Sequence, residues 1–269
     1  MNNFTNKKKN LISNQYIDSK NFMARVELNR KFGKNPYKWT LWIFDQIKFQ
    51  KDAKILELGG GNALLWRSNL DRIPEDAHIV LSDLSRGMLN DAEKILGNDS
   101  DKFEFKIIDA QKISYSKDSF DIIIANLMLY HVPNRKKALN EISRVLKNNG
   151  TFYATAFSEQ NMKELTELVL DFNKKVYNPL ESLAQAFGLE NGKKQLGKYF
   201  EEIKLIKYDD YLEVTEAEPL VNFILSSSNV IQHNEIEYFT DYIKRIIQNK
   251  RKIEITKESG IFIAKKPNY

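Results

Sequence analysis

Three consecutive glycines constrain the fold of this chain more than any other feature. Gly59, Gly60 and Gly61 follow the apolar run of residues 55–58 and precede a segment of helix-forming residues. An apolar run is typical of a parallel strand buried on both faces, and glycines let backbone N–H groups approach a bound ligand. The pattern predicts a strand, a ligand-binding loop and a helix. An ordinary strand-to-helix turn is the alternative.

The spacing of these glycines separates two kinds of nucleotide cofactor. A dinucleotide fingerprint needs a glycine at the sixth position counted from Gly59, where this chain has Leu64. Glu57 places a carboxylate near the strand end, which would repel a pyrophosphate but suits a cationic ligand that bears an amine. The loop therefore favours S-adenosylmethionine over NAD.

Two further apolar runs end in acids. Asp83 follows residues 79–82, and Asp109 follows the alternating segment 103–108. A carboxylate at the end of a neighbouring parallel strand can accept hydrogen bonds from ribose hydroxyls or from an adenine amino group. A helix cap is the alternative role for Asp83, and a solvated loop position is the alternative for Asp109.

Residues 57–63 resemble the first motif of the class I S-adenosylmethionine-dependent methyltransferases, acidic-x-Gly-x-Gly-x-Gly, with Ala63 in place of the third glycine. The block from residue 120 and the Arg-Val-Leu-Lys element at 144–147 resemble later motifs. The whole chain is also similar to a broad bacterial group of small-molecule methyltransferases. The resemblance implies that Asp83 binds the ribose, that Leu84 and Met88 line the adenine, that Asp109 and Ala110 contact its edge, and that Asn126 lies at the cofactor.

The order of the patterns predicts an α/β fold: a doubly wound, Rossmann-like, seven-stranded, mostly parallel sheet with an antiparallel last strand. N-terminal helices precede the sheet, and a helical insertion follows the fifth strand, residues 151–157. We expect a disordered basic tail over 1–12, a helical cover over 13–50, a cofactor-binding core over 51–157, a helical substrate cap over 158–200, and the rest of the fold over 201–269.

Two residues of the N-terminal cover, Tyr16 and Arg25, are candidates to reach the methionine carboxylate of the cofactor. Arginine binds carboxylates in a fork. A surface ion pair is the alternative for Arg25.

His131 is the candidate catalytic base, if the reaction needs one. It follows the predicted fourth strand, where a parallel sheet opens its ligand crevice, and an unperturbed imidazole titrates near neutral pH. The alternative is a histidine that only orients its loop. The three histidines are scattered and cysteine is absent, so we expect no metal site.

Composition bounds the class of protein. The 269 residues, 42% of them hydrophobic, can bury the core of one α/β domain with a helical accessory region. The absence of cysteine fits a cytoplasmic protein. The 41 basic residues face 36 acidic ones and are spread along the chain, so we expect no nucleic-acid partner. No apolar segment follows the N-terminal lysines, so we expect neither a signal peptide nor a membrane anchor.

These patterns together predict in-line methyl transfer from S-adenosylmethionine to an O or N atom of a small-molecule acceptor. An RNA or protein methyltransferase built on the same domain is one alternative. However, residues 126–129 read Asn-Leu-Met-Leu and lack the Asn-Pro-Pro-aromatic arrangement of enzymes that methylate exocyclic amines of bases. A non-catalytic protein that binds S-adenosylmethionine is the other alternative.

Overall fold

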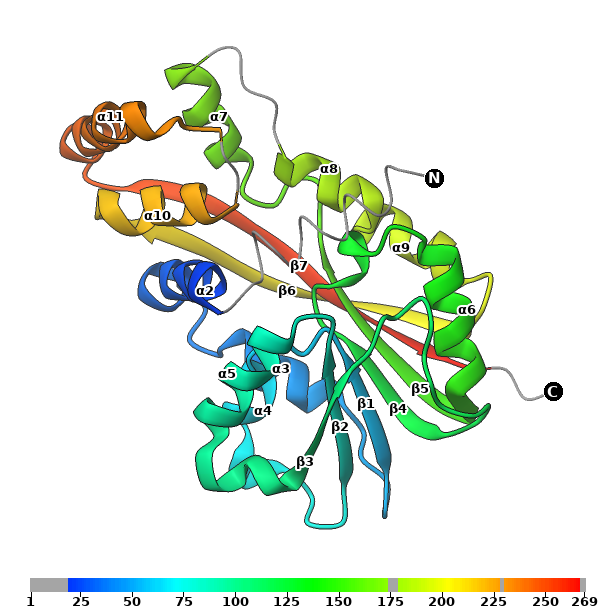
Figure 1. The fold of residues 1–269 in the computed structure, drawn as a ribbon. Helices are drawn as coiled ribbons and strands as arrows, with labels where there is room; N and C mark the ends of the chain where they lie inside the picture. Colours follow the sequence, from blue (N-terminus) through cyan, green and yellow to red (C-terminus); the bar gives the residue numbers. More distant parts are fainter. Residues whose placement is uncertain (1–18, 174–178, 228–229, 267–269) are drawn as a thin grey trace.

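The fold is built on one seven-stranded sheet. The computed structural model describes residues 19–173, 179–227 and 230–266, and its strand order is β3-β2-β1-β4-β5-β7-β6 (Figure 1). Strands β1 to β5 pair in parallel, whereas β7 is antiparallel to both β5 and β6. The predicted doubly wound α/β fold with an antiparallel last strand is confirmed.

The strands are β1 (Lys54–Leu58), β2 (His78–Asp83), β3 (Phe103–Ile107), β4 (Phe120–Ala125), β5 (Leu146–Phe157), β6 (Glu201–Val214) and β7 (Ile253–Lys265). The helices of the described residues are α2 (Lys20–Phe32), α3 (Trp39–Gln46), α4 (Leu64–Arg67), α5 (Arg86–Leu96), α6 (Arg135–Val145), α7 (Lys163–Phe172), α8 (Pro179–Ala186), α9 (Leu189–Leu196), α10 (Ala217–Ser227) and α11 (Ile236–Lys250). Short 3-10 turns join several of them.

Helices cover both faces of the sheet, which explains why the central strands lack a polar face. Ile122 and Ile124 of β4 join a core that includes residues of α3, α4 and α5, and Ile123 joins the opposite core with α6 and α9. Successive side chains of a strand point to opposite faces, so a strand buried on both faces reads as a continuous apolar run.

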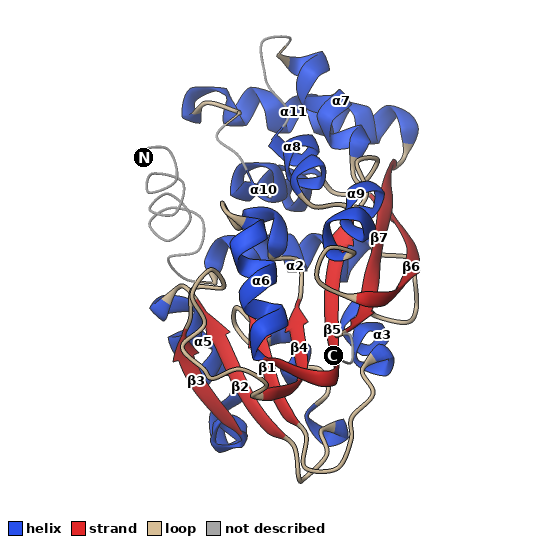
Figure 2. Cartoon of the chain, turned by 90° about the vertical axis from the view of Figure 1, so that its right-hand side faces the viewer, coloured by secondary structure: helices blue, strands red, loops and turns tan. Residues whose placement is uncertain are grey.

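Strands β6 and β7 extend past the carboxyl edge of the parallel strands. Phe157, the last residue of β5, pairs with Ser259 of β7, which in turn pairs with Tyr208 of β6. The β6–β7 ribbon continues from there to the pair Val214–Ile253. Its far end forms a separate hydrophobic core with α2, α7, α10 and α11, which Figure 2 shows gathered beyond the strand ends. The ribbon and α2 therefore form a wall over the carboxyl edge.

Some element boundaries differ from the predictions. The sequence pattern predicts a helix over about 135–147, but α6 ends at Val145 and β5 begins at Leu146 because Leu146 already pairs with Phe120. The pattern also predicts strands over 201–208 and 260–264, whereas β6 and β7 are longer because they pair with each other beyond the rest of the sheet. The predicted tail over 1–12 lies outside the described residues, and the division into segments stays a prediction.

Candidate active site

A cavity of about 590 Å³ lies at the carboxyl ends of the parallel strands, under α2 and the β6–β7 ribbon. It is lined by the predicted site residues of the described chain, namely Arg25, Glu57, Gly59, Gly60, Gly61, Asp83, Leu84, Met88, Asp109, Ala110, Asn126 and His131. Tyr16 lies outside the described residues. Topology therefore brings residues from five separate segments to one space, and their individual roles stay predictions.

The glycine corner between β1 and α4 requires glycine for two different reasons. Gly59 and Gly61 have φ values of +67° and +59°, in the left-handed region that favours glycine. Gly60 is required because there is no room for a side chain, since an added Cβ would lie 2.3 Å from Cδ1 of Leu81. The corner thus presents backbone rather than side chains to the cavity.

Asp83 ties the end of β2 to the glycine corner. Its Oδ2 accepts a hydrogen bond from the Gly61 N–H at 3.0 Å, and its Oδ1 accepts one from the Ser85 N–H at 2.8 Å. Ser85, not Asp83, caps α5, which removes the helix-cap alternative. Burial raises the pKa of the Asp83 carboxyl, although the backbone N–H groups oppose the rise. Each carboxylate oxygen has a second lone pair for a further donor.

Glu57 is a buried acid on the α4 side of β1. Its side chain is 1% exposed, and Oε2 accepts a hydrogen bond from the Trp66 indole N–H at 2.5 Å. Burial raises the pKa of Glu57 to about 7, the Trp66 hydrogen bond opposes the rise, and the nearby Asp83 adds to it. A cation that binds close by would favour the ionised form.

The ends of β3 and β4 complete this side of the cavity. Oδ1 of Asp109 accepts hydrogen bonds from the backbone N–H and the side-chain amide of Gln111, both at 3.0 Å. Asp109 faces the cavity, so it is not the fully solvated loop residue of the alternative reading. Beyond β4, Oδ1 of Asn126 accepts a hydrogen bond from the Thr155 hydroxyl at 2.7 Å, which fixes the loop to β5.

His131 lies in a buried environment that disfavours its protonated form. It ends a short turn, Leu129–His131, where its ring packs against Tyr130 with centroids 4.5 Å apart. Burial, with a smaller contribution from the charge of Arg25, lowers the pKa of His131 to about 3. Burial therefore opposes the protonation that a general base undergoes, and the role of His131 stays a prediction. The imidazole is neutral at pH 7 and is a weak base.

Arg25 links α2 to α10. Its Nη2 donates to the Ser226 carbonyl oxygen at 2.7 Å, and its Nε donates to the Ser226 hydroxyl at 3.4 Å. These hydrogen bonds join the two helices, and the expected contact of Arg25 with the methionine carboxylate stays a prediction. Arg25 also lines the cavity.

The polar residues of the β6–β7 ribbon were not among the predicted site residues. Tyr208, Asp210, Lys257 and Ser259 line the same cavity, and they form the cross-strand pairs Tyr208–Ser259 and Asp210–Lys257. One signal was available in the sequence. Lys257 falls at the inward position of a strand whose earlier inward residues, Ile253 and Ile255, are apolar and buried.

The described residues contain no group of three or more His, Cys, Asp or Glu side chains that could hold a metal ion. None of the helices described is both long and apolar enough to span a bilayer.

Comparison with known proteins identifies the family. A methyltransferase domain model matches residues 49–204, which is more than half of the chain. The ubiquinone/menaquinone biosynthesis C-methyltransferase of Vibrio vulnificus is 28% identical over 155 residues, covering 55% of this chain and 52% of that protein. Its counterpart in Neisseria meningitidis is 27% identical over 143 residues, covering 53% and 52%. The chain thus matches about half the length of these curated relatives.

Solved structures share the fold. The phosphoethanolamine N-methyltransferase 2 of Haemonchus contortus, in complex with phosphomonomethylethanolamine and S-adenosylhomocysteine, superposes with a TM-score of 0.60 at 17% identity, covering 97% of this chain and 60% of that one. The YcgJ protein of Bacillus subtilis superposes with a TM-score of 0.59 at 15% identity, covering 86% and 98%. With this fold and this family match, the chain belongs to the class I S-adenosylmethionine-dependent methyltransferase domain family.

Proposed function

We propose that this protein transfers a methyl group from S-adenosylmethionine to an O or N atom of a small molecule. The observation that carries the proposal is the single cavity into which the glycine corner and three strand-end acids, Glu57, Asp83 and Asp109, all face. Strand-end acids beside a glycine corner are the donor and acceptor set that an adenosyl group with an amine requires.

The residues present fit this cofactor. The left-handed backbone at Gly59 and Gly61 leaves the cavity free of Cβ atoms where a ligand would approach. Asp83 retains acceptor capacity for the ribose hydroxyls. Glu57, whose pKa is raised to about 7, would be stabilised as a carboxylate by the cationic amine of the methionine moiety. Leu84 and Met88 supply an apolar wall for the adenine.

The bound cofactor supplies an electrophilic methyl group, so the task of this chain is to orient and desolvate the acceptor. Orientation alone supplies effective molarities of about 10⁵ M or more in favourable cases. His131, neutral at pH 7, can accept or donate one hydrogen bond to the acceptor, but its low pKa makes it a poor proton acceptor. The proposal therefore assigns His131 a positioning role rather than the role of a general base.

The size of the cavity favours a small acceptor. Its volume of about 590 Å³ falls within the range of small-molecule sites, roughly 300–1,000 Å³, and part of it would be filled by the cofactor. The curated relatives are named for carbon acceptors and the Haemonchus enzyme for a nitrogen acceptor. An acceptor screen should therefore score methylation at carbon as well as at nitrogen and oxygen.

Calorimetric titration of the full chain with S-adenosylhomocysteine tests the cofactor half of the proposal. We expect saturable binding by the wild type and at least 10-fold weaker binding by Asp83→Asn, because the substitution removes a charge-assisted hydrogen bond. Asp71→Asn, on an exposed 3-10 turn outside the cavity lining, is the matched control and should bind as the wild type does. Absence of binding by the wild type, or undiminished affinity in Asp83→Asn, would contradict the proposal.

A further inference from the structure

The β6–β7 ribbon carries a lysine in an unusual setting. Lys257 lines the cavity just beyond the level at which β5 ends, because the next inward residue of β7, Ser259, pairs with the terminal Phe157 of β5. Within the described part of the chain, the ammonium group of Lys257 forms no ion pair and no hydrogen bond with another residue. The ammonium group of Lys257 is thus available to a ligand in the cavity.

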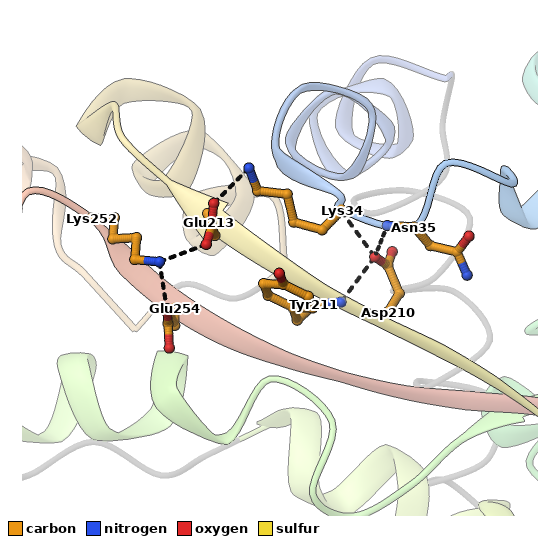
Figure 3. A network of polar contacts seen from close by, with 7 residues as sticks. All are labelled: Lys34, Asn35, Asp210, Tyr211, Glu213, Lys252 and Glu254. Carbon is orange, nitrogen blue, oxygen red and sulfur yellow. Dashed lines mark hydrogen bonds and ion pairs between the residues drawn. The ribbon is translucent and has the colours of Figure 1, made fainter.

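The acid that lies opposite Lys257 is held by other groups. Asp210 pairs with Lys257 across the ribbon, but no ion pair joins them. Instead, Oδ1 of Asp210 accepts hydrogen bonds from the backbone N–H groups of Lys34 at 3.1 Å, Asn35 at 2.8 Å and Tyr211 at 2.9 Å (Figure 3). Asp210 therefore fixes the loop between α2 and α3 to the ribbon, and it moderates the charge of Lys257 only from a distance.

Other lysines near the far end of the ribbon are neutralised locally. Lys252 contacts Glu213 at 2.5 Å and Glu254 at 2.7 Å, and Lys34 contacts Glu213 at 2.5 Å (Figure 3). Lys257 differs from them in facing the cavity and in lacking such a partner. Burial lowers the pKa of Lys257 to about 8, against the opposing influence of Asp210, so the ammonium form is destabilised until an anion approaches.

The two ends of the cavity differ in sign. Glu57, Asp83 and Asp109 line the end near the glycine corner. The walls formed by the ribbon and α2 carry Lys257 and Arg25 together with one acid, Asp210, whose Oδ1 already accepts three backbone hydrogen bonds. A ligand that is cationic at one end and a second ligand that is anionic at the other would match this arrangement.

We infer that the methyl acceptor carries an anionic oxygen group, a carboxylate or a phosphate, and that Lys257 binds this group at the β6–β7 wall of the cavity. The inference rests on the proposed function, since it names the class of acceptor for the same site. Tyr208 would flank the anion without being its main donor, because its hydroxyl already donates to the Tyr37 carbonyl oxygen at 2.7 Å.

Binding of matched probes tests the inference. Benzoate, phenyl phosphate and the neutral isostere benzamide are titrated by calorimetry into the full chain, with and without saturating S-adenosylhomocysteine. We expect benzoate or phenyl phosphate to bind the wild type at least 10-fold more tightly than Lys257→Met, because a charge-assisted hydrogen bond is lost. Benzamide should bind both proteins alike. A preference for one anionic probe distinguishes a carboxylate site from a phosphate site.

Three controls make the result decisive. Lys204→Met removes an exposed lysine of β6 that does not line the cavity, and it should leave anion binding unchanged. Lys257→Arg keeps the charge and should retain most of the affinity. The thermal unfolding midpoint shows that each variant is folded.

The inference is overturned if neither anion binds the wild type, or if Lys257→Met binds the anions as tightly as the wild type does. Failure of the proposed function has a different signature. In that case S-adenosylhomocysteine would not bind, while the probes would still report on Lys257 in the cofactor-free protein.

Discussion

The two halves of the cavity are built in different ways. The cofactor half comprises the glycine corner, Glu57, Asp83 and Asp109, each of which stands at or near the end of a parallel strand. The proposed acceptor half comprises His131, Tyr208, Asp210 and Lys257, which come from a loop and two antiparallel strands. The cofactor half thus follows from the sheet topology itself, whereas the acceptor half depends on what is packed over the sheet.

This difference suggests a division of labour. In the cofactor half, Asp83 and Asp109 accept hydrogen bonds from backbone N–H groups, and Glu57 accepts one from the Trp66 side chain. The proposed acceptor half is held by side chains that join separate elements, such as Tyr208 to Tyr37 and Asp210 to the loop after α2. Substitutions in the first half should therefore disturb the fold together with cofactor binding. Substitutions in the second half should act mainly on the acceptor.

The largest expected effect is at the glycine corner. Gly59→Ala combines a positive φ of +67° with a Cβ only 2.9 Å from Cβ of Met128, so we expect a loss of about 2–4 kcal/mol in the free energy of unfolding. Gly97→Ala is the comparison without crowding, since Gly97 has a φ of +57° and a ψ of −123° but open space around it, and backbone strain alone should cost about 1–3 kcal/mol there. Urea titration measures both values. Equal losses would show that crowding at the corner is unimportant.

A smaller effect is expected at Glu57, and it depends on pH. The pKa of Glu57 in the folded protein, about 7, lies above its usual value of 4.5, so the folded state binds the extra proton between these values. The free energy of unfolding of the wild type should therefore fall as the pH rises from 4.5 to 7. Glu57→Gln lacks this loss and should be more stable than the wild type by up to about 3 kcal/mol at pH 8.

Urea titrations at several pH values test the effect at Glu57. Glu93→Gln, on the exposed face of α5, is the control and should follow the wild type. Parallel profiles of stability against pH for the wild type and Glu57→Gln would contradict the raised pKa.

The smallest predicted effect concerns His131, in the acceptor half. Its pKa in the folded protein, about 3, lies below the usual 6.5, so between these values the unfolded chain binds a proton that the folded chain rejects. The stability of the wild type should therefore fall as the pH drops below 6.5. Between pH 7 and pH 5, the free energy of unfolding should fall by about 1–2 kcal/mol less in His131→Gln than in the wild type.

The control for His131 is His78→Gln, which alters an exposed histidine at the start of β2. The two substitutions are compared by thermal unfolding at pH 7 and pH 5. If both variants lose as much stability at pH 5 as the wild type does, the imidazole of His131 is not protected from protonation. The affinity for S-adenosylhomocysteine should be retained in His131→Gln. A large loss of affinity would contradict the assignment of His131 to the acceptor half.

The same division explains how much could be predicted from the sequence. Gly59, Asp83 and Asp109 follow apolar runs, and the carboxyl ends of adjacent parallel strands must meet at one edge of the sheet. The mostly parallel sheet and the convergence of these residues at one edge of it could therefore be predicted. Local patterns suffice where each functional residue stands at the end of a recognisable strand.

The acceptor half could not be predicted in this way. Asp210 and Lys257 face each other only because β6 and β7 pair in one particular register, and α10 and α11 separate these strands in the chain. Register of this kind is set by long-range packing. The lowered pKa of His131 also could not be predicted from the sequence, because it results from burial that no local sequence pattern indicates.

A crystal structure of the protein with S-adenosylhomocysteine bound tests the central claim most directly. We expect the ribose hydroxyls within hydrogen-bonding distance of the Asp83 carboxylate, the adenine between Met88 and Asp109, and the sulfur facing the space before His131 and Lys257. A ligand that lies elsewhere in the molecule, or in this cavity with its ribose away from Asp83, would contradict the account.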